Sequence, residues 1–160
     1  MDEIFVRKIE PKDIDWVKKV LIESWGSETV IGTKPFDAPK LPGFIAEINE
    51  KPVGLLTYNI EGDNLEIVSI DSLENGKGIG TALMDKAKET AKDNNLNKVS
   101  LVTSNDNVDA LRFYQKRGFR IVKIYPDAID EARKIKPQIP LLGNYGIPLK
   151  DALELEYKIQ

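Results

Sequence analysis

Two hydrophobic periods alternate along the chain, which predicts a fold in which strands and helices follow one another. Residues 4–9 have the alternation of a strand. Residues 11–26 begin with Pro11 and Asp13, carry apolar side chains at helical spacing and end on Gly26, which predicts a helix. Gly, Pro, Lys and Asp then dominate residues 32–42, so an irregular loop is expected there.

The middle and the end of the chain continue this alternation. Residues 43–49 and 53–60 are predicted to form a hairpin around Glu50-Lys51-Pro52, and residues 65–71 to add a third strand. The elements expected after it are a helix from Gly78 to Asn94, a strand at 99–103, a helix at 107–116, a strand at 119–124, a short helix at 127–136 and a strand at 152–159. The last strand is a plausible edge for a homodimer, although its alternating glutamates would also keep an edge soluble.

Composition narrows the class of protein. The 160 residues fit a single domain spanning 1–160. The chain has no Cys and no His, which excludes disulfides, Cys and His nucleophile systems and His-ligated metal sites, so no metal is expected. The net charge of −3 gives no field that favours nucleic acid. Apolar runs are too short for a membrane span, and the acidic residues 1–5 do not resemble a secretory signal, so we expect a cytoplasmic protein with no membrane partner.

A glycine-rich turn leads from the strand at 65–71 into the next helix. It reads Asn75-Gly76-Lys77-Gly78-Ile79-Gly80 and continues with Thr81. Glycines at a helix start expose N–H groups at the positive end of the helix dipole, which is a site for an anion. The spacing fits neither the dinucleotide fingerprint nor the P-loop, and a simple Asn-Gly turn is the competing interpretation.

A second motif lies about 30 residues further along. Residues 107–119 fit the pattern N-x-x-A-x-x-x-Y-x-x-x-G-F. Together with the glycine turn, this motif resembles the GNAT acetyltransferase superfamily, whose pyrophosphate loop reads (Q/R)-x-x-G-x-(G/A). Gly78 and Gly80 match that pattern, whereas Asn75 stands where Gln or Arg is usual. The tail, with Gly146-Ile-Pro-Leu-Lys-Asp-Ala-Leu-Glu, is similar to a subgroup of the family.

The resemblance implies an α/β fold with a mixed central sheet, two splayed parallel strands and helices on both faces. It also implies acetyl-CoA in the gap between the strands at 65–71 and 99–103. The residues expected to bind it are Val68, Ser69 and Ile70 by their backbone, Asn75, Gly76, Lys77, Gly78, Ile79, Gly80 and Thr81 around the pyrophosphate, and Asn107 and Tyr114. Asn107 is equally well explained as a helix N-cap. Arg112, Lys116, Arg117 and Arg120 form a basic cluster that suits the 3′-phosphate of CoA or a solvated face.

The implied chemistry is acetyl transfer to a primary amine of a small molecule or peptide by direct attack. Tyr114 resembles the family tyrosine that gives a proton to the departing thiolate; packing of its helix is the alternative. An amide near Ile70 is the implied oxyanion donor. Glu66 is the candidate base, on the same strand face as Val68 and Ile70 unless a bulge intervenes, and an ordinary strand residue is its alternative. The family glutamate position falls on Asn64.

Two other interpretations remain open at this stage. A non-catalytic acyl-CoA sensor would keep the glycine loop but not need Tyr114, and a protein-interaction domain would use neither. Clues to the acceptor are few: Trp25, next to Gly26, is a candidate wall of the acceptor site or a core residue. Residues 137–148, rich in Pro and Gly, are a substrate loop or an ordinary connection.

Overall fold

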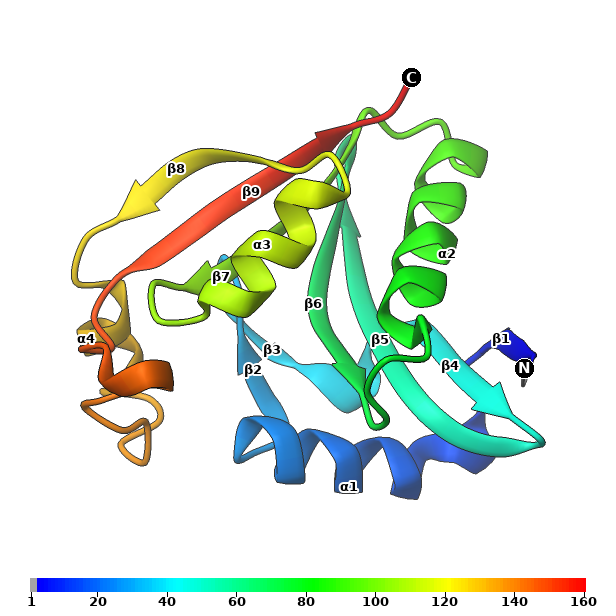
Figure 1. Cartoon of the computed structure of the whole chain (residues 1–160), viewed down its shortest axis with the longest axis horizontal. Coiled ribbons are helices and arrows are strands. Elements are labelled where there is room, and N and C mark those ends of the chain that lie inside the picture. Colours follow the sequence, from blue (N-terminus) through cyan, green and yellow to red (C-terminus); the bar gives the residue numbers. More distant parts are fainter. Residues whose placement is uncertain (1–2) are drawn as a thin grey trace.

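A seven-stranded mixed sheet forms the centre of the molecule, with the strand order β1-β4-β5-β6-β7-β9-β8 (Figure 1). The computed structural model describes residues 3–160; Met1 and Asp2, which belong to the acidic N-terminal stretch, lie outside the described residues. The strands of the sheet are β1 (Ile4–Lys8), β4 (Gly43–Ile48), β5 (Lys51–Glu61), β6 (Asn64–Ser72), β7 (Lys98–Ser104), β8 (Arg120–Tyr125) and β9 (Ala152–Lys158). A separate two-stranded hairpin is formed by β2 (Thr29–Ile31) and β3 (Pro35–Asp37).

The parallel pair β6–β7 opens part-way along its length. The two strands pair from Asn64 opposite Lys98 to Ile67 opposite Leu101. Beyond that point β6 continues to Ser72 and β7 to Ser104 without pairing to each other. All other strand pairs of the sheet are antiparallel. The sheet therefore contains a V-shaped gap between β6 and β7, as predicted.

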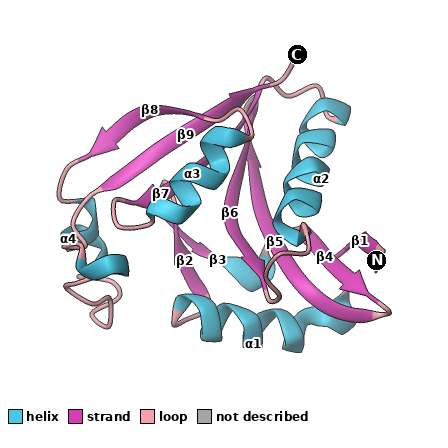
Figure 2. Cartoon of the chain, in the orientation of Figure 1, coloured by secondary structure: helices cyan, strands magenta, loops and turns pink. Residues whose placement is uncertain are grey.

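Helices cover both faces of the sheet (Figure 2). They are α1 (Ile14–Trp25), α2 (Ile79–Asp93), α3 (Val108–Lys116) and α4 (Ala128–Ala132), with short 3-10 turns at Pro11–Asp13, Ala38–Lys40 and Asn144–Gly146. Leu83 and Met84 of α2 share one buried cluster with Tyr114 of α3 and Leu101 of β7. Val17, Val20 and Leu21 of α1 pack in a second cluster on the opposite face, which explains their helical spacing. The predicted fold class is confirmed.

Three local predictions were wrong. The hairpin between β4 and β5 turns at Asn49 and Glu50, both in the left-handed region, because Pro52 pairs with Glu47 beside a bulge and so lies inside β5. Residues 32–42 are not irregular throughout, since β3 lies within them and pairs with β2. The predicted short helix is limited to α4, because Arg133 and Lys136 hold the chain that follows it in a different path.

The predicted edge position of the last strand was also wrong. β9 lies between β7 and β8, because residues 126–151 carry the chain back antiparallel into that space. In the described part of the chain the sheet edges are β1 and β8. Homodimer formation stays a prediction. Among residues 3–160, no helix is long and apolar enough to cross a membrane.

Candidate active site

The β6 edge of the gap offers free backbone groups. Antiparallel pairing with β5 uses one side of β6 as far as Ser72, whereas the side facing β7 is unpaired from Val68 onward. Ser69 is fixed by a hydrogen bond between its hydroxyl and that of Thr57 (2.6 Å). An extended ligand can therefore add to β6 in the gap as a strand would.

A bulge in β6 changes which side chains share a face. The β5–β6 register shifts between Thr57 and Tyr58, so that Val68 is the extra residue on β6. Val68 packs in the α1 cluster, while Ile70 packs against the α2 cluster on the other face. Glu66 therefore shares its face with Val68, whereas the bulge, whose absence was the condition for a shared face, places Ile70 on the other face.

The glycine turn brings free N–H groups to the end of the gap. Gly76 and Gly78 have φ angles of 74° and 78°, in the left-handed region that favours glycine, and Gly78 is the N-cap residue of α2. No side chain caps this helix start, and its first internal hydrogen bond runs from Ala82 N to Gly78 O (3.0 Å). The N–H groups of the three residues Ile79–Thr81 donate to no described residue. This geometry suits an anionic group such as a pyrophosphate.

Arg117, the residue that follows α3, stabilises the start of α2. Its guanidinium donates twice to the Thr81 hydroxyl (3.1 and 2.7 Å) and once to the Phe113 carbonyl (3.0 Å), and it lies 3.6 Å from the centre of the Phe113 ring. A side chain at Gly80 would bring its Cβ to 3.2 Å from that same ring, so only glycine lets α3 approach without a shift. Within the basic cluster seen in the sequence, Arg117 thus places a positive charge beside the glycine turn.

Tyr114 is buried at the inner side of α3. It is 8% exposed and packs against Phe113 and Phe119. Burial, reinforced by the negative charge of Asp71, raises the pKa of Tyr114 to about 12. Its hydroxyl forms no hydrogen bond with any residue in the range 3–160. Tyr114 is therefore a protonated phenol with a free donor at neutral pH.

Asp71 is a residue of this region that the sequence did not single out. Its carboxylate accepts a hydrogen bond from the Trp25 indole (2.9 Å), and burial raises its pKa. Trp25, a candidate substrate wall in the sequence, packs on the α1 cluster and does not line the pocket described below. The pairing of these two residues joins elements 46 positions apart, which the sequence pattern could not show.

Glu66 is buried and fully engaged by the β2–β3 hairpin. Its two carboxylate oxygens accept hydrogen bonds from the Thr33 N–H (2.9 Å) and the Thr33 hydroxyl (2.6 Å). The side chain is on the same sheet face as α1 and is 5% exposed. The geometry supports a role in holding the hairpin against β6; its role as a base stays a prediction.

Asn107 precedes α3 but does not cap it through its side chain. Its amide donates to the Thr103 hydroxyl (3.0 Å), and no capping hydrogen bond forms. The side chain thereby fixes the end of β7 to the start of α3. The N-cap interpretation of this side chain was wrong, and a contact to a cofactor stays a prediction.

A pocket of about 720 Å³ lies beside the gap, on the sheet face opposite α3. It is bounded by the tip of the β2–β3 hairpin, the end of β8 and α4. Val102 lines it and is the first residue of β7 beyond the last β6–β7 pair, so the pocket borders the opening of the gap. Its lining is mostly apolar, with Tyr125 and four charged residues, Lys34, Lys123, Glu131 and Lys134.

The sequence pattern of the Acetyltransferase (GNAT) family matches residues 12–119. The chain belongs to this family. It is also 42% identical over 152 residues to the uncharacterized protein YxbD of Bacillus subtilis (strain 168), with 94% of each chain covered.

Solved structures show that the GNAT fold extends through the whole chain. An IAA acetyltransferase from Bacillus cereus ATCC 14579 matches with a TM-score of 0.72 at 23% identity, covering 98% of this chain and 99% of that one. A GNAT family acetyltransferase from Elizabethkingia anophelis with acetyl-CoA bound matches with a TM-score of 0.71 at 21% identity, covering 99% of each chain. At these identities the likeness establishes the fold.

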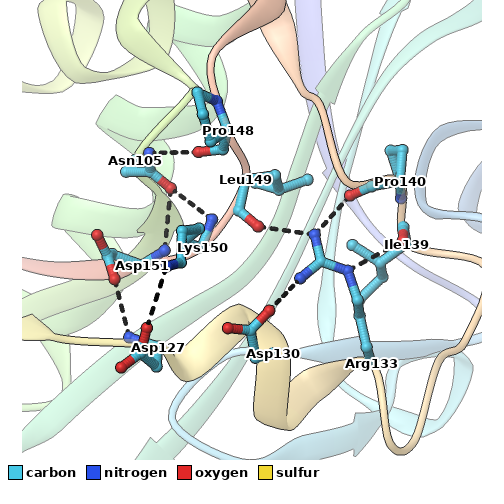
Figure 3. Close-up of polar contacts among 10 residues, drawn as sticks. All are labelled: Asn105, Asp127, Asp130, Arg133, Ile139, Pro140, Pro148, Leu149, Lys150 and Asp151. Carbon is cyan, nitrogen blue, oxygen red and sulfur yellow. Dashed lines mark hydrogen bonds and ion pairs between the residues drawn. The ribbon is translucent and has the colours of Figure 1, made fainter.

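The GNAT family match ends at Phe119, and the tail that follows is organised by two cations. Arg133 donates to the carbonyls of Ile139 (3.2 Å), Pro140 (2.6 Å) and Leu149 (2.7 Å) and pairs with Asp130 (2.6 Å), as Figure 3 shows. Lys136, buried and with its pKa lowered by burial, donates to the carbonyls of Trp25, the last residue of α1, and Thr29, the first residue of β2.

The tail is also tied to the loop that leads from β7 to α3. The Asn105 side chain accepts from the N–H groups of Lys150 and Asp151 and donates to the Pro148 carbonyl (Figure 3). Asp106 accepts from the Asn144 N–H (2.8 Å). Because α4 and Ile135 line the pocket, the tail is a fixed wall of that pocket. Sequence reasoning left this segment undecided, since the two partners of Lys136 lie 111 and 107 positions away along the chain.

Proposed function

We propose that this GNAT chain is an acetyl-CoA-dependent N-acetyltransferase that transfers the acetyl group to a primary amine by direct attack. The observation that carries the proposal is the gap in the sheet, whose unpaired β6 edge leads to the uncapped N-terminus of α2. A strand-like pantetheine arm and a pyrophosphate fit these two features in that order. The Elizabethkingia anophelis relative, with acetyl-CoA bound, supports the same cofactor here.

Different residues of the gap bind different parts of acetyl-CoA. The backbone of Val68, Ser69 and Ile70 receives the pantetheine arm, and the turn from Asn75 to Thr81 receives the pyrophosphate. Arg117 holds Thr81 in place and adds positive charge. Side-chain atoms at Gly76 and Gly78 would meet only open space, so the turn leaves room for phosphate oxygens. Acetyl-CoA supplies the thioester as the acetyl donor when bound.

Tyr114 is the proposed proton donor of the reaction. A phenol with a pKa of about 12 keeps its proton at neutral pH and can donate it in a hydrogen bond to the sulfur as the thiolate departs. The backbone N–H near Ile70 is the proposed donor to the carbonyl oxygen. The acceptor, a small-molecule or peptide amine, occupies the pocket beside Val102, which is walled by α4 and the β2–β3 hairpin.

Thiol release from acetyl-CoA tests this proposal. A panel of 2-phenylethylamine, cadaverine, L-phenylalanine and a peptide with a free N-terminus covers apolar, dicationic, zwitterionic and peptidic amines. We expect release of CoA with at least one of them, and a drop in kcat of tenfold or more for Tyr114→Phe with unchanged acetyl-CoA affinity. Acetyl-CoA binding without thiol release from any amine would favour a non-catalytic acyl-CoA sensor instead.

A further inference from the structure

One hydroxyl–carboxylate pair lies at the edge of the acceptor pocket and is not used by the proposal above. The Tyr125 hydroxyl donates to Oε1 of Glu154 at 2.6 Å. Tyr125 lines the pocket, and Glu154 lies opposite Val102 in the β7–β9 register, next to the point where the β6–β7 gap opens. The pair thus lies beside the space where the amine and the thioester have to meet.

The carboxylate of Glu154 is more available than that of Glu66. Thr33 occupies both oxygens of Glu66, as described above. Glu154 accepts its hydrogen bond from Tyr125 and forms no other hydrogen bond or ion pair with a residue in the described range. Glu156, two positions along the same strand face, is held by Lys98 (3.0 Å). Among these three carboxylates, Glu154 is the one that has neither a cation paired with it nor hydrogen bonds to both of its oxygens.

We propose that Tyr125 and Glu154 form the path by which the acceptor ammonium loses its proton, an inference that rests on the proposed function. The Tyr125 oxygen accepts a hydrogen bond from the ammonium. As one N–H bond breaks, the Tyr125 oxygen takes that proton, and its own proton passes to Glu154. The products are a neutral amine with a free lone pair and a carboxylic acid, which later returns the proton to solvent.

The electrostatic surroundings of Tyr125 favour transfer of the proton from the ammonium toward Glu154. The hydrogen bond to Glu154, then burial and the negative charges of Glu154, Glu66 and Glu156, raise the pKa of Tyr125 to about 12. The hydroxyl therefore stays protonated until it passes its proton on, and a cation at its oxygen is stabilised. The other charged groups that face the pair or the pocket are Lys123, which lies 4.5 Å from the Tyr125 ring, Arg120, Lys98, Lys34, Lys134 and Glu131.

The test compares Glu154→Gln and Tyr125→Phe with two matched controls. Glu156→Gln removes a carboxylate from the same strand face, and Tyr145→Phe removes a hydroxyl that is bound to Asp109 (2.7 Å) on an exposed loop. The assay is the pH dependence of kcat and KM between pH 6.5 and 9.5 with 2-phenylethylamine, or with the panel amine that the wild type acetylates fastest. Acetyl-CoA affinity and thermal stability are measured alongside.

We expect kcat at pH 7 to fall about 100-fold for both test variants and to stay within threefold of the wild type for both controls. The loss should shrink as the pH approaches the pKa of a primary amine, about 10, because the acceptor then arrives already neutral. The double variant should be no slower than the slower single variant, since both residues serve one step. A purely structural defect would not fade with rising pH.

Three results would overturn the inference. The first is a wild-type pH profile for both variants; the second is a loss of kcat that is the same at every pH; the third is a rise in KM alone, which would make the pair a binding contact. In each case the wild type still acetylates an amine, so the proposed function stands. If the wild type releases no thiol with any panel amine, the proposed function fails and the inference falls with it.

Discussion

The local stability of the β2–β3 hairpin, which borders the acceptor pocket, should depend on the Thr33–Glu66 contact. Thr33→Val removes the hydroxyl that donates to buried Glu66 at 2.6 Å, but it keeps the side-chain shape and the backbone N–H bond of 2.9 Å. A hydrogen bond to a charged group contributes about 1.5–3 kcal/mol, so the β2–β3 hairpin should lose about 2 kcal/mol of local stability. That loss corresponds to about a 30-fold increase in the open population of the hairpin.

Amide hydrogen exchange measures the open population of the hairpin directly. Exchange at residues 29–37 should become about 30-fold faster in Thr33→Val, while exchange in α2 is unchanged. The matched control is Thr29→Val on β2, whose hydroxyl forms no hydrogen bond with the described part of the chain. Unchanged exchange in the hairpin of Thr33→Val would refute the reasoning that Glu66 serves as its anchor.

Three further perturbations follow from the same structure. Asp13→Asn should lower the free energy of unfolding by about 2 kcal/mol at pH 7 in urea, because the hydrogen bond from Arg7 lowers the pKa of Asp13 to about 2. This stabilisation is present above about pH 4 and is lost as the pH falls toward 2, where the stabilities of variant and wild type should converge. Gly78→Val should weaken CoA binding at least tenfold in calorimetry and lower Tm by only a few degrees, because a β-branched residue resists a φ of 78° and shifts the turn, although the space there is open. Arg133→Lys should raise the KM for the amine and leave the affinity for acetyl-CoA unchanged, since lysine cannot reproduce the contacts to three carbonyls. Equal weakening of amine and acetyl-CoA binding would contradict the role of the tail as a pocket wall.

The sequence predicted the parts of the molecule that depend on local pattern. The helical spacing of Val17, Val20 and Leu21 predicted α1, and the glycines before α2 predicted its uncapped start. The family resemblance added the gap, which the pattern of buried strands alone does not reveal. These predictions were correct because the hydrophobic period, the backbone freedom of glycine and the spacing of the motifs all depend on short stretches of sequence.

The errors and omissions came from contacts between distant segments. The position of β9 between β7 and β8 depends on the return of the chain after β8, which no short window encodes. The bulge at Val68 moved Ile70 to the other face from Glu66, and alternation counted along the strand could not detect it. Asp71 and Tyr125 were overlooked for a similar reason, because their partners, Trp25 and Glu154, are 46 and 29 residues away.

The most direct measurement is a calorimetric titration of the wild-type protein with acetyl-CoA, followed by competition with free CoA and with acetyl-pantetheine. The gap and the uncapped start of α2 predict micromolar acetyl-CoA binding, full competition by CoA, and much weaker competition by acetyl-pantetheine, which lacks the pyrophosphate. Absence of binding at millimolar acetyl-CoA, or equal competition by the two ligands, would contradict the assignment of residues 75–81 as the pyrophosphate site.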